Sequence, residues 1–290
     1  MVGTGRWYQT RNFARLGLSV LAPFLFVTLA MPCMAQASSN AYLLYRQWQP
    51  YDWPENRPSA NEVTRSQRGL GWQNQGSSGT FGIDYDYQPL RIRTGEPAHN
   101  GHLHRLTFGG EWQYRLYRLE ARAGIAGTSN MFKYQDFHSD VVNGRIALFR
   151  AINEASSFSL GVGGDHRFGT FRWLPRVRWK QSNERGQWLV DLPVLVQWQS
   201  PGRLWEFRLE RIGDRWATLD KAREVESALY LREWRTELTY RVHDGEGSWP
   251  AVALGIGASI DTRVRYQDLG TGTVDLSLGE ALLASLRLDW

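Results

Sequence analysis

The segment 106–125, LTFGGEWQYRLYRLEARAGI, carries the pattern that decides the fold. Over 106–116 the even positions are Leu, Phe, Gly, Trp, Tyr and Leu, while the odd positions are polar, charged or glycine. Over 117–125 the apolar residues stand at the odd positions instead. Because side chains alternate between the two faces of a β-strand, this pattern predicts two strands joined by a tight turn at Leu116-Tyr117.

The predicted turn also determines which polar side chains face each other. Pairing the two strands across it sets Glu111 opposite Arg122 and Gln113 opposite Glu120. Opposite charges across a strand pair stabilise a sheet by roughly 0.2–1 kcal/mol each.

The same alternation recurs along most of the chain, in 188–198, 205–210, 230–242 and 252–260. Many of these strands reach the roughly 9–11 residues needed to cross a bilayer, whereas strands of soluble proteins usually have about 5–6. Trp188 and Trp198 stand at the two ends of one apolar row, where an aromatic ring would lie among lipid headgroups. A barrel with its apolar faces toward lipid therefore fits better than a soluble β-sandwich.

The last strand adds a resemblance to a known class of proteins. Leu282, Ala284, Leu286, Leu288 and Trp290 share one face of it. This segment resembles the C-terminal strand of bacterial outer-membrane β-barrels, which ends in an aromatic residue after alternating apolar residues. The resemblance implies an all-β, transmembrane, antiparallel up-and-down barrel surrounded by outer-membrane lipids. It also implies that Leu286, Leu288 and Trp290 signal to the barrel-assembly machinery of a Gram-negative cell.

The beginning of the chain has the three parts of a secretory signal peptide. Three arginines precede an apolar run at 16–30, and a small-x-small cleavage site follows at 35–37. We therefore expect residues 1–37 to be removed and 38–290 to form the barrel. The cut would also remove Cys33, the only cysteine, so that the mature chain has no disulfide and no thiol nucleophile.

Charge argues against a nucleic-acid partner. The leader holds three of the 34 basic residues and none of the 29 acidic ones, so the mature chain has 31 basic against 29 acidic residues. Nucleic-acid binding normally requires a clear excess of Lys and Arg.

Counting the connections predicts about twelve strands, within a range of ten to fourteen. Barrels of this class have both termini and their short turns in the periplasm, and longer loops outside. The count treats 158–181 as one irregular strand interrupted near 165–170. If that interruption is a true loop, a second strand must also be misassigned for the number to stay even.

If the apolar rows face lipid, the lumen is crowded with charge. The predicted lumen-lining residues are Glu111, Arg115, Arg118, Glu120, Arg122, Arg176, Arg178, Glu206, Arg208, Glu210, Glu233, Arg235, Glu237 and Arg241. These side chains could interlock and fill a narrow barrel, or line a water channel for small polar or anionic solutes. A barrel of about twelve strands has an interior width between that of small barrels filled by side chains and that of open porins. We favour a filled or very narrow lumen, because Arg and Glu are bulky and nearly balanced here.

Two groups of residues are weak candidates for catalysis. His138, Ser139 and Asp140 lie in a predicted outer loop, and Asp165 and His166 lie in the irregular segment. A lipid hydrolase needs a nucleophile, a base and an orienting group brought together. Neighbours on an extended chain point in opposite directions, and no lipase signature is present. Ordinary loop polarity is therefore the better interpretation.

His99, His102 and His104 have a spacing that could hold zinc or copper. Glu96 is the only carboxylate close to them in sequence, so a solvated loop is the favoured interpretation and no metal or other cofactor is expected.

The sequence thus predicts a non-enzymatic outer-membrane barrel, either narrow and porin-like or structural in the envelope. One alternative is a lipid-modifying enzyme, an acyl hydrolase or transferase. Another is a barrel that anchors or exports something for an envelope pathway.

Overall fold

A computed structural model describes residues 38–51, 63–92, 101–134, 137, 141–153, 157–167, 171–220, 225–245, 249–268 and 272–290. The predicted signal peptide at 1–37, His99 and the group His138, Ser139 and Asp140 lie outside these described residues.

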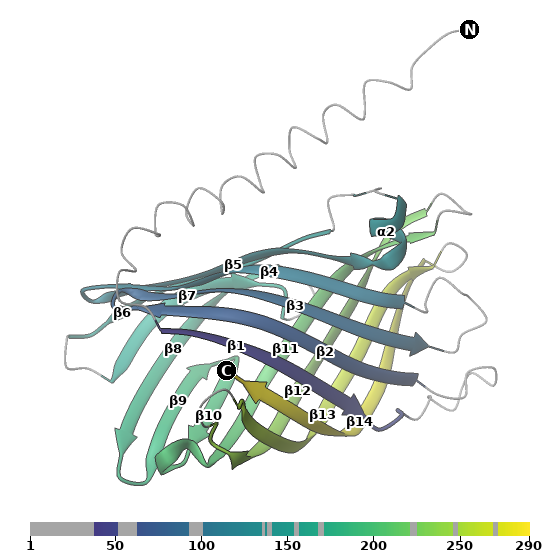
Figure 1. Ribbon diagram of the computed structural model, residues 1–290. Helices are drawn as coiled ribbons and strands as arrows, with labels where there is room; N and C mark the ends of the chain where they lie inside the picture. The colour runs from purple at the N-terminus through teal and green to yellow at the C-terminus, as the bar shows by residue number, and fades with distance from the viewer. Residues whose placement is uncertain are drawn as a thin grey trace, which may run out of the picture.

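The strands are β1 (Ser38–Trp48), β2 (Val63–Gly76), β3 (Gly79–Ile92), β4 (Gly101–Tyr114), β5 (Tyr117–Thr128), β6 (Val142–Ala151), β7 (Phe158–Asp165), β8 (Arg172–Asn183), β9 (Gly186–Leu192), β10 (Leu195–Gln199), β11 (Trp205–Asp220), β12 (Val225–His243), β13 (Ala251–Asp268) and β14 (Gly272–Asp289). A helix, α2 (Ser129–Tyr134), and a 3-10 turn, η4 (Pro201–Arg203), accompany them. Each strand pairs with its neighbours in the chain, and β14 pairs antiparallel with β1, which closes the barrel (Figure 1). This confirms the predicted all-β, antiparallel, up-and-down barrel.

The described strands number fourteen rather than about twelve, because two predicted strands are hairpins. The segment 158–181 forms β7 and β8, which pair with each other. The segment 188–198 forms β9 and β10, and Trp188 lies directly opposite Trp198 instead of at the far end of one strand. Three residues, 192–194, separate the paired Asp191 and Leu195. Because the number of connecting residues is odd, apolar residues stay at even positions on both sides of the turn. The alternation therefore continues through it and does not reveal the turn in the sequence.

The β4–β5 hairpin turns one residue earlier than predicted. Tyr114 pairs with Tyr117, so Glu111 faces Glu120 and the predicted pairs of Glu111 with Arg122 and of Gln113 with Glu120 are wrong. Arg115 lies in the two-residue turn with a φ of 51°, outside the strand that was expected to place it in the lumen.

The two ends of the barrel differ. At one end, here called the turn end, lie the two-residue turns at 77–78, 115–116 and 184–185, together with Ser38 and Trp290. At the other, the loop end, β1, β3, β5, β11 and β13 finish. Within the described residues, no helix is long and apolar enough to cross a membrane.

The wall is uneven in height. β9 and β10 have 7 and 5 residues, whereas β11 to β14 have 16 to 19. Beyond these short strands, β11 lies beside β5, where Ala217 pairs with Gly127. The Asn143 side chain donates a hydrogen bond of 2.9 Å to the Arg215 carbonyl at the same seam. Fewer strands therefore enclose the loop end than the turn end.

Two irregularities reverse the faces of β13 and β14. The pairing register shifts between Ser259 and Thr262, where Asp261 has a φ of 50°. It shifts again between Thr262 and Arg263, where Gly279, the partner of Thr262, has a φ of 74°. On the turn-end side of this bulge the even apolar positions point outward, and Ile256 is 69% exposed. On the loop-end side even positions point inward, and Val264 is 0% exposed.

Candidate functional site in the barrel interior

Apolar side chains fill the interior at the loop end. This loop-end core consists of Trp48, Tyr51, Val63, Leu90, Leu103, Ala126, Trp216, Leu229, Leu231, Val264, Tyr266, Val274, Leu276, Leu278, Ala281 and Leu283. They come from both sides of the barrel, from β1 to β5 and from β11 to β14. Burial on this scale is the strongest stabilising contribution available to such a fold.

A buried ionic layer lies directly beneath this core. Glu233 accepts hydrogen bonds of 2.6 Å from Arg65 and 2.6 Å from Arg235. Both guanidiniums stack on Trp48, at 4.2 and 5.1 Å from its ring centroid. The Trp48 indole in turn donates to the Ser259 hydroxyl at 2.7 Å. The layer is withdrawn from water, so each charge depends on its partners.

A polar cavity of about 400 Å³ occupies the interior between this layer and the turn end. Its lining includes the arginines Arg46, Arg105, Arg122, Arg145, Arg208, Arg215, Arg235 and Arg287 and the carboxylates Asp84, Asp86, Glu210 and Asp214. Arg105 bridges two of those carboxylates, at 2.6 Å from Asp86 and in close contact with Asp214. Arg122 lies 3.5 Å from Asp84, with its side chain 53% exposed against 25% for the aspartate.

A second ionic cluster lines the wall formed by β5 to β9. Arg176 donates two hydrogen bonds to Asp191, at 2.8 and 2.7 Å. Arg178 lies 3.2 Å from Asp191 and also contacts Glu120. Phe149 is buried beneath both guanidiniums, at 5.5 and 4.7 Å. These side chains fill the part of the interior that they face.

The predicted lumen residues fall into distinct settings. Arg122, Arg208, Glu210 and Arg235 line the cavity. Other members are tied into the interior by ion pairs or hydrogen bonds, namely Glu111, Arg118, Glu120, Arg176, Arg178, Glu206, Glu233 and Glu237. Arg241 lies near the turn end, 3.8 Å from Asp244. Arg115 does not belong to this set, because it lies in a turn.

Sequence reasoning missed several interior residues. Arg46, Arg65, Asp86 and Asp191 were not assigned to the lumen. Asp86 stands between Tyr85 and Tyr87, and Asp191 between Val190 and Leu192, so alternation could have indicated these two. Arg65 stands between the polar Thr64 and Ser66, so alternation could not have indicated it. The loop-end core was missed altogether, because nothing in the alternation marks where inward and outward change places.

The catalytic candidates that the structure describes are not brought together. Asp165 receives the Arg167 amide at 3.0 Å and lies 3.3 Å from the Arg167 guanidinium. His166 lines the cavity beside Phe171, and burial followed by the charge of Arg215 lowers the pKa of its ring. Among the described residues, the cavity lining has neither a serine nor a cysteine.

The two described histidines of the candidate metal group have other partners. His104 contacts the Tyr85 hydroxyl through Nδ1 at 2.8 Å and Ser129 through Nε2 at 2.7 Å. His102 stacks on Tyr87 and contacts its hydroxyl. In the described part of the chain, no group of three potential ligands that could hold a metal ion was found.

Comparison with known proteins identifies no relative by sequence, since no family model and no curated protein matches. Two solved structures share a coarse similarity. A bacterial polysaccharide outer membrane secretin is 10% identical, with 87% of this chain and 97% of that chain covered and a TM-score of 0.37. The outer membrane protein opdK from Pseudomonas aeruginosa is 8% identical, with 89% and 98% covered and a TM-score of 0.28. At these values neither similarity assigns a function to the chain.

Proposed function

We propose that this chain is an outer-membrane β-barrel that is closed to solute flow and serves a non-enzymatic, structural role in the envelope. The observation that carries the proposal is the reversal of polarity along the strands. The turn-end half has apolar residues outside and charges inside, and the loop-end half has the opposite arrangement.

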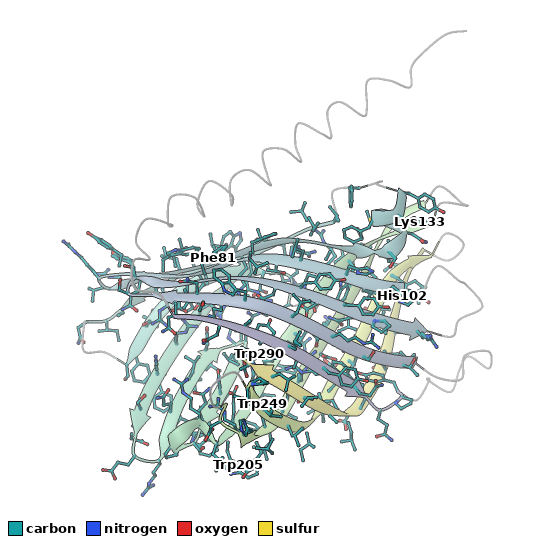
Figure 2. The ribbon with its side chains drawn as sticks, in the orientation of Figure 1. Phe81, His102, Lys133, Trp205, Trp249 and Trp290 are labelled. Carbon is teal, nitrogen blue, oxygen red and sulfur yellow. The ribbon has the colours of Figure 1, made fainter. Side chains whose placement is uncertain are left out.

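Lipid is the solvent that accounts for the outer face of the turn-end half. Ile256 and Leu282 are 69% and 64% exposed, and water would penalise so continuous an apolar surface. Trp205, Trp249 and Trp290 are exposed near the turn end (Figure 2), where aromatic rings suit the headgroup region.

The proposed orientation follows from the connections. Short turns and both ends of the barrel belong in the periplasm, so the loop end would face outward. Leu286 and Trp290, both exposed on the outer face, would be available to the barrel-assembly machinery together with Leu288.

The closed lumen favours a structural role over that of a porin. The loop-end core and the layer of Arg65, Glu233 and Arg235 occupy the interior above the cavity. An open channel would require moving a buried core and separating buried ion pairs, which costs several kcal/mol.

A planar-bilayer recording tests the proposal. Folded wild-type protein should insert without discrete conductance steps, and its insertion can be verified by heat-modifiable gel mobility of the recovered protein. Trp216→Ala/Tyr266→Ala/Glu233→Ala, which empties part of the loop-end core and breaks the ionic layer, should produce steps under the same conditions. Regular steps from the wild-type barrel would refute the closed lumen.

A further inference from the structure

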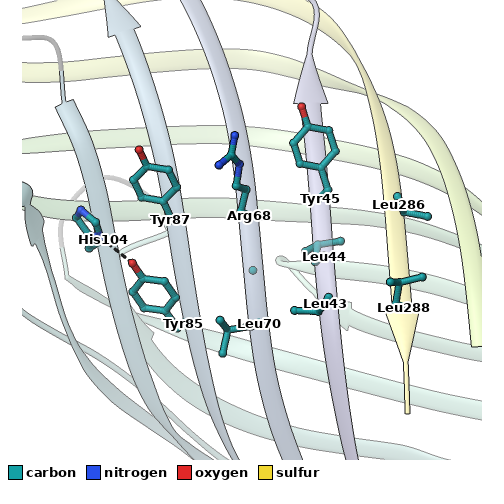
Figure 3. A pocket seen from close by; sticks show the side chains of 11 residues that line it. Leu43, Leu44, Tyr45, Arg68, Leu70, Tyr85, Tyr87, His104, Leu286 and Leu288 are labelled. Carbon is teal, nitrogen blue, oxygen red and sulfur yellow. Dashed lines mark hydrogen bonds between the residues drawn. The ribbon is translucent and has the colours of Figure 1, made fainter. Parts of the chain in front are cut away.

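A groove of about 640 Å³ lies on the outer face of the barrel, across β14, β1, β2 and β3 (Figure 3). Its lining includes the apolar side chains of Leu43, Leu70, Leu286 and Leu288, together with three tyrosines, Arg68 and His104. The groove is open to the surroundings of the barrel, as the exposure of Leu43 and Leu70 shows.

The pairing register arranges these side chains in two rows across the strands. One row, in order of pairing, is Leu286, Tyr45, Arg68, Tyr87 and His104. The next row toward the turn end is Leu288, Leu43, Leu70 and Tyr85. Arg68, with Tyr45 and Tyr87 on either side, therefore lies next to the leucine row, on its loop-end side.

Arg68 differs from the inward arginines of β1 and β4. Arg46 and Arg105 each hold a carboxylate at 2.9 and 2.6 Å. Arg68 points outward and has its guanidinium 5.9 Å from the Tyr87 ring centroid. Among the described residues, no carboxylate lies within ion-pair distance of it. The Tyr85 and Tyr87 hydroxyls are occupied by His104 and His102.

An arginine on a lipid-facing surface is costly unless an anion accompanies it. The anion that a membrane supplies at the headgroup level is a phosphate, which the planar guanidinium binds through two parallel hydrogen bonds. Acyl chains attached to that phosphate-bearing group would lie against the leucine row beneath.

We propose that this groove is a binding site for one phosphorylated, acylated glycolipid of the loop-side leaflet, with its phosphate on Arg68 and an acyl chain along Leu43 and Leu70. The site rests on the membrane embedding proposed above. The glycolipid is chosen over a phospholipid because the loop end would face the outer leaflet, which in a Gram-negative outer membrane consists mainly of phosphorylated glucosamine lipids.

Native mass spectrometry of the folded, detergent-purified full chain can test this site. The probes are a diphosphorylated, hexa-acylated glucosamine disaccharide, the same lipid after removal of its phosphates, and phosphatidylglycerol. Arg68→Gln is the test variant. Arg265→Gln is the matched control, because Arg265 is also outward but already has Asp275 at 2.9 Å.

The proposal expects the wild type and Arg265→Gln to retain the phosphorylated glycolipid equally and Arg68→Gln to retain about tenfold less, a loss of the size that one charge-assisted contact produces. Removing the phosphates from the lipid should produce the same loss in the wild type. Equal retention by Arg68→Gln would overturn the site, and stronger retention of phosphatidylglycerol would overturn the choice of lipid. If the wild type retained no lipid at all, the binding site would be overturned, whereas the membrane embedding is tested separately by insertion into a planar bilayer.

Discussion

The turn-end and loop-end halves of the same strands place opposite kinds of residue on their outer and inner faces. In the turn-end half of β13, Leu254 and Ile256 point outward with Gly255 between them, while charged side chains from β1 and β12 meet inside. In the loop-end half of the same strand, Arg263 and Arg265 point outward and Val264 is buried inside. On the membrane embedding proposed above, the contrast teaches that the solvent on each side determines which residues a barrel wall needs, so that one strand would face lipid along one stretch and water along the next.

The position of the change has a structural cause. A β-bulge inserts one residue and turns every later side chain to the other face. Gly279 of β14 pairs with Thr262, the residue after Asp261 in β13, so both strands reverse together. The two halves therefore meet at one level of the barrel on this side.

The largest expected effect comes from the layer between the halves. Glu233→Gln should lower the free energy of unfolding by about 3–5 kcal/mol, because two buried guanidiniums lose the charge that balances them. Urea unfolding followed by tryptophan fluorescence measures it. Glu280→Gln, at an exposed glutamate, is the control and should change little. A loss below about 1 kcal/mol for Glu233→Gln would mean that water reaches the layer.

The next effect tests the outer faces directly. Ile256→Arg, on the turn-end half, should cost about 2–4 kcal/mol of folding free energy in lipid vesicles, the range for arginine in a bilayer interior. Thr273→Arg, outward on the loop-end half, should be nearly neutral. Folding titrations in urea with vesicles present provide both values. Equal costs at the two positions would remove the distinction between the halves.

A smaller effect is expected at the short β9–β10 hairpin, where the barrel wall is lowest. The Trp188 and Trp198 rings lie 6.3 Å apart, and a double-mutant cycle with leucine at both positions should give a coupling of about 0.5–1.5 kcal/mol. A single continuous strand would separate the two residues by roughly 33 Å at about 3.3 Å a residue. Zero coupling would therefore favour that strand over β9 and β10.

The smallest effect belongs to the water-facing wall of the cavity. Arg122→Gln should change stability by no more than about 1 kcal/mol, because a half-exposed pair gains little from its contact. The change should shrink further in high salt, which screens accessible charges. A loss as large as that of Glu233→Gln would show that the cavity is as dry as the layer above it.

Alternation in the sequence was enough to predict the closed antiparallel barrel, and the parity of the connections brought the strand count close. Alternation could not locate two kinds of feature: a turn that leaves the pattern unchanged, and a bulge that exchanges the inward and outward faces. The connection at 192–194 leaves the alternation in phase, so a hairpin resembles one strand. In β14 the even positions from Val274 to Leu288 are apolar except Glu280, yet the bulge at Gly279 makes the first of them point inward and the last outward. For that reason the alternation did not predict the loop-end core.

The interior charges were predicted as a class and not as pairs. Glu233 and Arg235 were assigned to the lumen, but the partner Arg65 comes from a strand far away in the sequence. Such pairs depend on how the barrel closes, which alternation within one strand does not specify.

The central claim is that lipid surrounds the turn-end half and water surrounds the loop-end half. Residues 38–290 contain no cysteine, so single cysteines can be introduced along β13 at positions 254, 256, 260, 263 and 265 and spin-labelled in reconstituted vesicles. We expect labels at 254, 256 and 260 to collide with dissolved oxygen, and labels at 263 and 265 to collide with a water-soluble nickel chelate. Nickel access at all five positions would contradict the account, because the apolar outer face would then be in water.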